Sequence, residues 1–136
     1  MDSKVGLSSI FGELVLLNGS KGAFETGQDA EGGINLIAVH GIENAVNPSS
    51  ICLSWRQDDG VKESWLTTLL PLYVRYSHSA TYNYSIPQDI EISTMHIRAH
   101  AERLLDEIST KVTKSKKFVF LGHDLGGLII KEVSNI

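Results

Sequence analysis

The segment from Phe118 to Ile130 constrains this chain more than any other. It reads Phe-Val-Phe-Leu-Gly-His-Asp-Leu-Gly-Gly-Leu-Ile-Ile. A short apolar run, a glycine-rich turn and a second apolar run follow one another without a break, which predicts a buried strand that turns sharply into a helix. Glycines in such a turn let the two backbones approach closely. We therefore expect a strand over 117–121, a tight turn over 122–127 and a helix over 125–133.

Apolar and β-branched runs elsewhere predict further strands. The run over 34–39 is bounded by Gly33 and Gly41 and is typical of a strand buried on both faces of a parallel sheet. The segment over 79–84 is rich in strand-forming residues, and we expect Tyr82 and Tyr84 on one of its faces. A first strand over 13–17 and a helix over 63–70 complete this set.

The clearest helix pattern covers residues 94–112. Apolar residues recur there at helical spacing, and the charged residues between them are expected to face solvent. The charged positions are Arg98, Glu102, Arg103 and Glu107. Alternation of strands and helices predicts an α/β fold, with a mostly parallel sheet and flanking helices. A length of 136 residues suits one such unit. We divide the chain into an N-terminal strand with a flexible glycine-rich segment, 1–33, and an α/β part, 34–136.

Composition excludes several classes of function. The 12 basic and 16 acidic residues give a net charge of −4, which is no footprint for a nucleic acid. The single cysteine, Cys52, provides neither a disulfide nor a thiolate zinc site. His96 and His100 lie four residues apart and could share a metal, but without a third ligand the spacing favours two surface histidines. We expect no metal and no cofactor. The sequence has neither a signal-peptide pattern nor an apolar stretch of spanning length, so we expect a cytoplasmic protein.

The turn carries the candidate chemistry. Its sequence Gly-His-Asp-Leu-Gly matches the G-x-S-x-G turn that presents the nucleophile in α/β-hydrolases, with Asp124 in the serine position. In that architecture the oxyanion hole consists of two backbone N–H groups, one after the nucleophile and one in the loop after a neighbouring strand. We assign these to Leu125 and Ile42. The residues expected to shape the site are His40, Gly41, Gly122, His123, Gly126 and Gly127.

This turn and three other segments resemble a lipase-like serine esterase family that includes GPI inositol-deacylase-like proteins. The other segments are Val39–Gly41, Trp65–Pro71 and Ala80–Tyr84. The closest likeness is to hydrolase-like N-terminal domains of fungal proteins that also carry a nucleotide-binding module and repeats. The resemblance covers residues 34–136 and implies the N-terminal half of a truncated α/β-hydrolase fold. It also implies a lipid or ester substrate. In such relatives the turn reads Gly-His-Ser-Leu-Gly-Gly, so the catalytic serine corresponds to Asp124.

The aspartate leaves three functions open. A carboxylate that accepted an acyl group would form an anhydride, so the first expectation is an incomplete domain that is inactive as an esterase. The histidine base and the acid follow the nucleophile in this fold, yet no histidine follows Asp124 and the only side-chain carboxylate there is Glu132. The second is an aspartate-nucleophile hydrolase like the epoxide hydrolases, completed by a C-terminal half. Epoxide hydrolases usually have the sequence His-Gly-x-Pro in their oxyanion loop, and the residues that follow His40 in this chain differ from that pattern. The third is a non-catalytic module whose open sheet edge oligomerises or meets a protein partner or a membrane surface.

Overall fold

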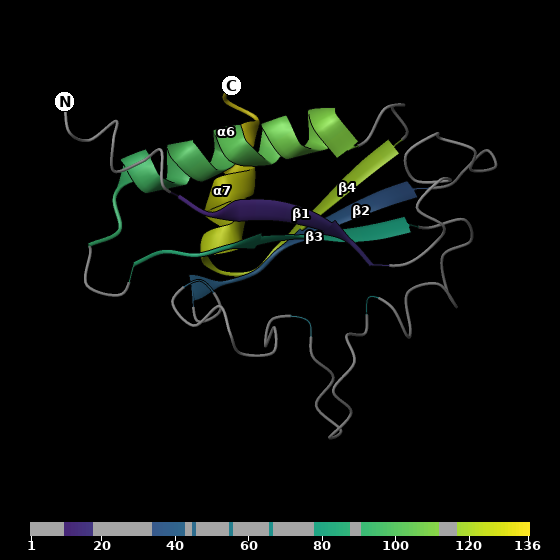
Figure 1. Ribbon diagram of the computed structural model, residues 1–136, viewed down its shortest axis with the longest axis horizontal. Helices are drawn as coiled ribbons and strands as arrows, with labels where there is room; N and C mark the ends of the chain where they lie inside the picture. The colour runs from purple at the N-terminus through teal and green to yellow at the C-terminus, as the bar shows by residue number, and fades with distance from the viewer. Residues whose placement is uncertain are drawn as a thin grey trace, which may run out of the picture.

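The structure is a computed structural model, and it describes residues 10–17, 34–42, 45, 55, 66, 78–87, 91–111 and 117–136. Two helices and four strands are defined within these ranges (Figure 1). In chain order they are β1 (Gly12–Leu16), β2 (Ile34–Val39), β3 (His78–Tyr84), α6 (Thr94–Lys111), β4 (Lys117–Gly122) and α7 (Leu125–Val133). The strands and helices expected from the sequence over these ranges are confirmed to within one or two residues at their ends. The expected helix over 63–70 and the glycine-rich segment over 18–33 lie outside the described residues, apart from Leu66.

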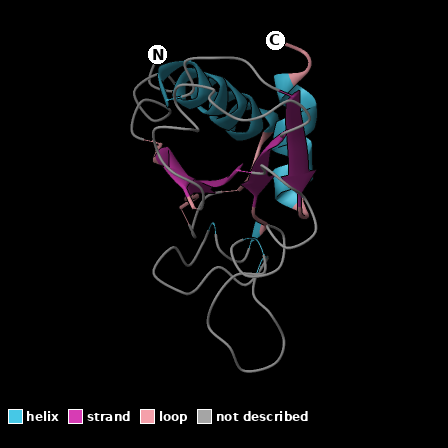
Figure 2. Cartoon of the chain, turned by 90° about the vertical axis from the view of Figure 1, so that its right-hand side faces the viewer, coloured by secondary structure: helices cyan, strands magenta, loops and turns pink. Residues whose placement is uncertain are grey.

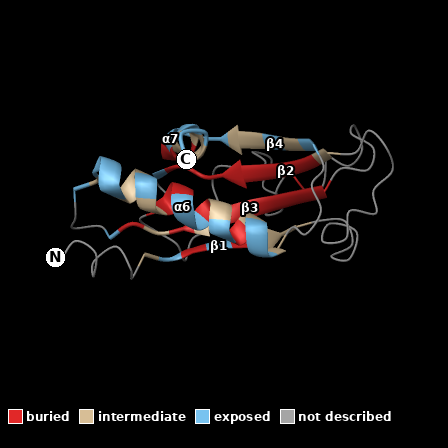
Figure 3. Ribbon diagram, turned by 90° about the horizontal axis from the view of Figure 1, so that it is seen from above, coloured by how far each residue is buried: buried red, intermediate tan, exposed pale blue. Residues whose placement is uncertain are grey.

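The four strands form one sheet in the order β1-β3-β2-β4. The central strand β2 runs parallel to both of its neighbours, and only β1 is antiparallel to its partner β3. The fold is therefore of the α/β class with a mostly parallel sheet, as the sequence predicted. Burial follows the strand order, because β2 and β3 are buried along most of their length whereas β4 is partly exposed (Figure 3). The continuous apolar sequence of β2 reflects this position between two other strands.

Helices α6 and α7 pack on the same face of the sheet and contact each other (Figure 2). Their apolar side chains cover alternate residues of the strands, because successive side chains of a strand point to opposite faces. The core on this face contains Ile37, Val39, Ala80, Tyr82, Tyr84, Leu104 and Ile129. On the other face, Trp55 and Leu66 pack against Leu36 and Ala38 of β2. The described residues thus cover both faces of the central strand.

Charged side chains of α6 bind the outer edge of β1. The Nε of Arg103 donates to the Gly12 carbonyl at 2.9 Å, and the Nζ of Lys111 donates to the Leu14 carbonyl at 2.8 Å. The Leu14 N–H in turn donates to Oε1 of Glu107 at 2.8 Å. These bonds supply the partners that the backbone of an edge strand otherwise lacks. The expectation that Glu107 faces solvent was wrong, since it is only 9% exposed. It is buried because it accepts this backbone hydrogen bond and pairs with Lys111.

Candidate functional site

The turn between β4 and α7 holds Asp124 in an unusual backbone conformation. Its φ is 58° and its ψ is −122°, and it is the one non-glycine residue of the described ranges with a positive φ. L-amino acids rarely adopt this region, which costs about 1–3 kcal/mol and persists only where the surrounding structure holds it. The strain belongs to the residue that the sequence singles out as the nucleophile position. The side chain is exposed at the end of the sheet.

Two glycines of the turn allow α7 to start against the strands. A Cβ at Gly126 would overlap the carbonyl oxygen of Val39, and a Cβ at Gly122 would lie 2.6 Å from the Cα of Gly127. Neither position accepts a larger residue without movement of the backbone. We expected a side chain at Gly127 to obstruct the approach of the helix to the strand. That expectation was wrong, because a Cβ there meets nothing within 4 Å. Its Cα lies close to Gly122, but its own side-chain direction is open.

The loop after β2 packs directly against this turn. Strands β2 and β4 are parallel neighbours, with Val39 opposite Gly122, so their carboxyl ends lie at the same edge of the sheet. The His123 N–H donates to the Val39 carbonyl at 3.1 Å. A Cβ at Gly41 would lie 2.7 Å from Nδ1 of His123 and 3.1 Å from Cβ of Asp124. Gly41 therefore permits the contact between the two segments.

One predicted oxyanion-hole donor binds the Asp124 side chain. The backbone N–H of Ile42 donates to Oδ2 of Asp124 at 3.1 Å. The second assigned residue, Leu125, is the first residue of α7 and is 7% exposed. The first N–H groups of a helix have no partner within that helix. The structure thus brings Ile42, Asp124 and Leu125 together, and it places the Asp124 carboxylate on the Ile42 N–H.

His40 is buried and fully engaged rather than free to act as a base. Its Nδ1 lies 2.9 Å from the Gly41 carbonyl, and its Nε2 accepts from the Tyr84 N–H at 3.3 Å. The ring stacks on Tyr84 at a centroid separation of 4.2 Å, and the Tyr84 hydroxyl donates to the His40 carbonyl at 2.8 Å. Burial lowers the pKa of His40, although its two backbone hydrogen bonds act in the opposite direction. The side chain is therefore neutral and structural.

The other described histidines near α6 also have partners. Nδ1 of His96 accepts hydrogen bonds from the N–H and the hydroxyl of Ser93 at the start of α6. Nδ1 of His100 lies 2.9 Å from the hydroxyl of Tyr82. The expectation that both are surface histidines was wrong for His100, which is 1% exposed. Burial lowers the pKa of His100 to about 4. Within the described residues, no group of three or more His, Cys, Asp or Glu side chains could hold a metal ion.

The 40–42 loop and the turn lie beyond the carboxyl ends of the neighbouring parallel strands β2 and β4. After β4 the chain enters α7 on the face that α6 also covers, and Ala45 after β2 packs on that same face, whereas Trp55 and Leu66, further along the chain, pack on the opposite face. Open α/β sheets bind ligands beyond the carboxyl ends of their strands. The topology thus points to the same edge as the motif.

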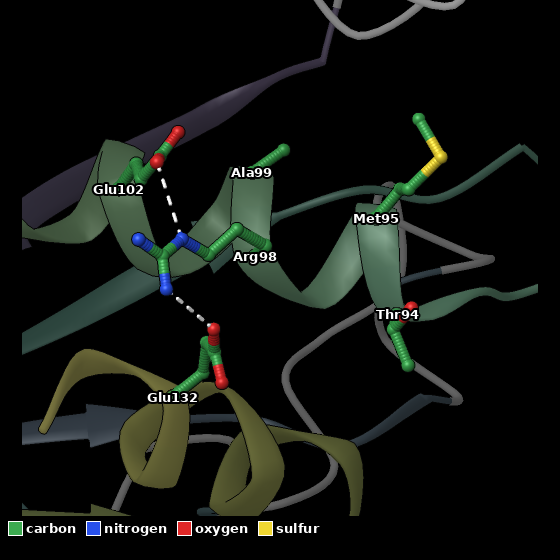
Figure 4. A pocket seen from close by; sticks show the side chains of 6 residues that line it. All are labelled: Thr94, Met95, Arg98, Ala99, Glu102 and Glu132. Atoms are coloured by element: carbon green, nitrogen blue, oxygen red, sulfur yellow. Dashed lines mark hydrogen bonds and ion pairs between the residues drawn. The ribbon is translucent and has the colours of Figure 1, made fainter. Parts of the chain in front are cut away.

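A hollow of about 320 Å³ lies elsewhere, along the contact of α6 with α7 (Figure 4). It is lined by Thr94, Met95, Arg98, Ala99, Glu102 and Glu132. Arg98 donates to Glu102 at 3.2 Å and to Glu132 at 2.8 Å, so it joins the two helices and satisfies both carboxylates. None of the predicted site residues lines this hollow. The ion pairs account for its charged groups, and we assign it no chemistry.

Sequence reasoning missed the role of Tyr84. It placed Tyr84 on a strand but not beside His40, which is 44 residues away in the chain. The available signal was the parallel arrangement of β2 and β3, which brings the residues that follow β2 next to the end of β3. Only the register of that pair identifies the partner.

Comparison with known proteins gave no match to a family model, to a curated protein or to a solved structure. Among the described residues, no helix is both long enough and apolar enough to cross a membrane.

Proposed function

We propose that the chain carries the nucleophile turn and the oxyanion loop of an α/β-hydrolase-type site, with a carboxylate in the nucleophile position. We propose further that it does not hydrolyse esters. The resemblance to lipase-like esterases motivates the first part. The strand order supports it, because the strand that precedes the oxyanion loop must lie beside the strand that precedes the nucleophile. Here β2 and β4 are such neighbours.

The contact between Ile42 and Asp124 carries the proposal. In a serine enzyme the donors of the oxyanion hole must be available to the substrate oxygen that becomes negative in the transition state. Here the Ile42 N–H already donates to the Asp124 carboxylate, at 3.1 Å. An ester carbonyl would have to displace a full negative charge from that donor. A carboxylate that attacked the ester would also form an anhydride rather than a stable acyl-enzyme.

The proposal is tested by hydrolysis of short-chain nitrophenyl esters. We expect the chain to release nitrophenol no faster than its Asp124→Ala variant, because neither offers a hydroxyl nucleophile at the turn. Ester turnover by the unmodified chain that disappears in Asp124→Ala would refute the proposal. Saturation with substrate separates true turnover from slow acylation of surface groups.

A second candidate function follows from the same contact, in which Asp124 attacks an alkyl carbon of an epoxide or alkyl halide. The hydrogen bond from Ile42 fixes Oδ2 and leaves Oδ1 as the nucleophilic oxygen. With an epoxide, Oδ1 would form the new C–O bond while the carbon–oxygen bond of the epoxide breaks, and the alkoxide would take a proton from an acid or from water. With an alkyl halide, the carbon–halogen bond would break instead and the halide ion would leave. Water would then cleave the resulting alkyl ester at its carbonyl, where the developing charge on Oδ2 already faces an N–H donor.

Mass spectrometry distinguishes the two candidates. Incubation with a reactive epoxide such as styrene oxide should add one epoxide mass at Asp124 if the residue is a nucleophile. Asp106 of α6, an exposed aspartate, is the internal control for unspecific alkylation. Equal modification of Asp106 and Asp124, or no modification of either, would remove the second candidate and leave the inactive site.

A further inference from the structure

The peptide unit between Gly41 and Ile42 is held at both of its ends. Its N–H donates to Oδ2 of Asp124 at 3.1 Å. Its carbonyl oxygen, that of Gly41, lies 2.9 Å from Nδ1 of His40 and accepts the Ala45 N–H at 3.3 Å. A peptide unit is planar, so fixing its carbonyl also fixes the direction of its N–H. Hydrogen bonds at the carbonyl also polarise the unit and strengthen its N–H as a donor.

The surroundings of His40 determine which of its nitrogens carries the proton. Nε2 faces the backbone N–H of Tyr84, a donor, at 3.3 Å and must therefore accept. Nδ1 faces the Gly41 carbonyl, which can only accept, so Nδ1 carries the proton. Stacking on the Tyr84 ring, with an interplanar angle of 2°, keeps the imidazole from rotating. The Tyr84 hydroxyl also anchors the His40 backbone through its carbonyl.

We propose that His40 is a positioning residue whose neutral Nδ1–H tautomer holds the Gly41–Ile42 peptide with its N–H toward Asp124. A flipped peptide would turn the Gly41 carbonyl toward the Asp124 carboxylate and leave the His40 N–H without an acceptor. Two negative oxygens would then face each other in place of a hydrogen bond. The inference deepens the proposed function, on which its catalytic meaning rests, but the orientation itself is measurable without any turnover.

The tautomer is measured first, on the unmodified chain. Long-range ¹H–¹⁵N correlation spectra of a ¹⁵N-histidine-labelled sample, recorded above the ordinary histidine pKa of about 6.5, distinguish Nδ1–H from Nε2–H. The His40 signals are assigned by their loss in His40→Asn. We expect the Nδ1–H tautomer. An Nε2–H tautomer would overturn the proposal, because that ring could not donate to the Gly41 carbonyl.

Two variants then separate positioning from simple packing. The side-chain nitrogen of Asn in His40→Asn can occupy the place of Nδ1, whereas that of Gln in His40→Gln reaches the place of Nε2. The readout is the chemical shift of the Ile42 amide proton, measured in each protein with and without the further substitution Asp124→Asn. The difference between the two shifts reports the contact between Ile42 and Asp124. We expect this difference to persist in His40→Asn and to be lost in His40→Gln.

Asp106→Asn is the control for the Ile42 shift measurement. It removes an exposed carboxylate of α6 and should leave the Ile42 amide unmoved. An Ile42 shift change as large in His40→Gln as in the unmodified chain would overturn the proposal. If His40→Gln does not fold, the tautomer and the His40→Asn result still decide it. Ester turnover at Asp124 would refute the proposed function and leave the His40 measurements unaffected.

Discussion

At the scale of single residues, the adjacent glycines Gly126 and Gly127 differ in what an added side chain would contact. We predict that Gly126→Ala destabilises the chain by about 1–3 kcal/mol or more, because the new methyl group overlaps the Val39 carbonyl and the backbone must shift. Gly127→Ala adds the same methyl group in open space within α7. It should be neutral or stabilising by about 0.5–1 kcal/mol, because alanine favours the helix. Urea unfolding of the two variants measures the difference, and equal stabilities would contradict the described packing.

The backbone strain at Asp124 gives a second prediction at this scale. Asp124→Gly and Asp124→Ala both delete the carboxylate and its bond to Ile42, but only alanine keeps a Cβ at φ 58°. The strained conformation costs a residue with a side chain about 1–3 kcal/mol. Glycine avoids that cost and loses only about 0.5–1 kcal/mol through the entropy of the unfolded chain. Glycine should therefore be the more stable variant in chemical denaturation. A more stable alanine variant would mean that the turn is not strained.

At the scale of elements, helix α6 closes the outer edge of β1. We predict that Glu107→Ala costs about 1–3 kcal/mol, because the Leu14 N–H is left without its acceptor and Lys111 loses one of its two carboxylate partners. The matched control is Glu102→Ala on the same helix, which breaks a solvent-exposed pair with Arg98. Exposed pairs contribute about 0–1 kcal/mol. Thermal unfolding of both variants tests the prediction, which fails if Glu102→Ala is the more damaging change.

The elements were predictable where a local pattern sets the structure. The glycine-bounded apolar run of β2 and the turn from β4 into α7 needed no knowledge of the rest of the chain. Glu107 and His100 were not predictable in the same way. Each lies three or four residues from Leu104, on the flank of the apolar stripe, so periodicity alone leaves its environment open. Their burial follows from partners on other strands, the Leu14 N–H for Glu107 and Tyr82 for His100.

The candidate site shows the same division between local and long-range information. The sequence alone proposed Asp124 and the 40–42 loop, because glycine spacing and strand ends are local features. The contacts that fix the loop depend on the register of β3 against β2, which brings Tyr84 to His40. No single-sequence pattern encodes that register.

For the whole molecule, buried histidines make stability depend on pH. Burial lowers the pKa of His100 to about 4 from 6.5, so the unfolded chain binds a proton more readily than the folded chain within that range. Stability should therefore be highest above pH 6.5 and fall as the pH drops toward 4. His40, whose pKa burial also lowers, acts in the same direction. The pKa of Glu107 is lowered as well, against the effect of its burial, by its bonds to Leu14 and Lys111, so its contribution is lost only below 4.5.

Urea midpoints measured between pH about 6.5 and about 4 check this dependence. The variant His100→Phe keeps a ring in the core but cannot bind a proton, so its midpoints should fall less steeply than those of the unmodified chain. Identical slopes in the two proteins would show that His100 does not titrate as its burial requires.

The two edges of the sheet differ at this scale. Side chains of α6 bind the edge of β1, whereas β4 lies at the other end of the strand order with Val119 42% exposed and Leu128 of α7 52% exposed. Self-association or binding of a partner at the β4 edge therefore stays a prediction. It does not bear on the chemistry at Asp124.

The central claim is that position 124 presents a carboxylate, held by Ile42, where a serine hydrolase presents its nucleophile. Labelling with a fluorophosphonate that reacts with activated serines, read by intact-protein mass, tests it most directly. We expect the chain to keep its unmodified mass under conditions that label a control serine esterase to completion. Stoichiometric labelling of the chain at any serine would contradict the account, since an activated serine would then be present and Asp124 would not mark the nucleophile position.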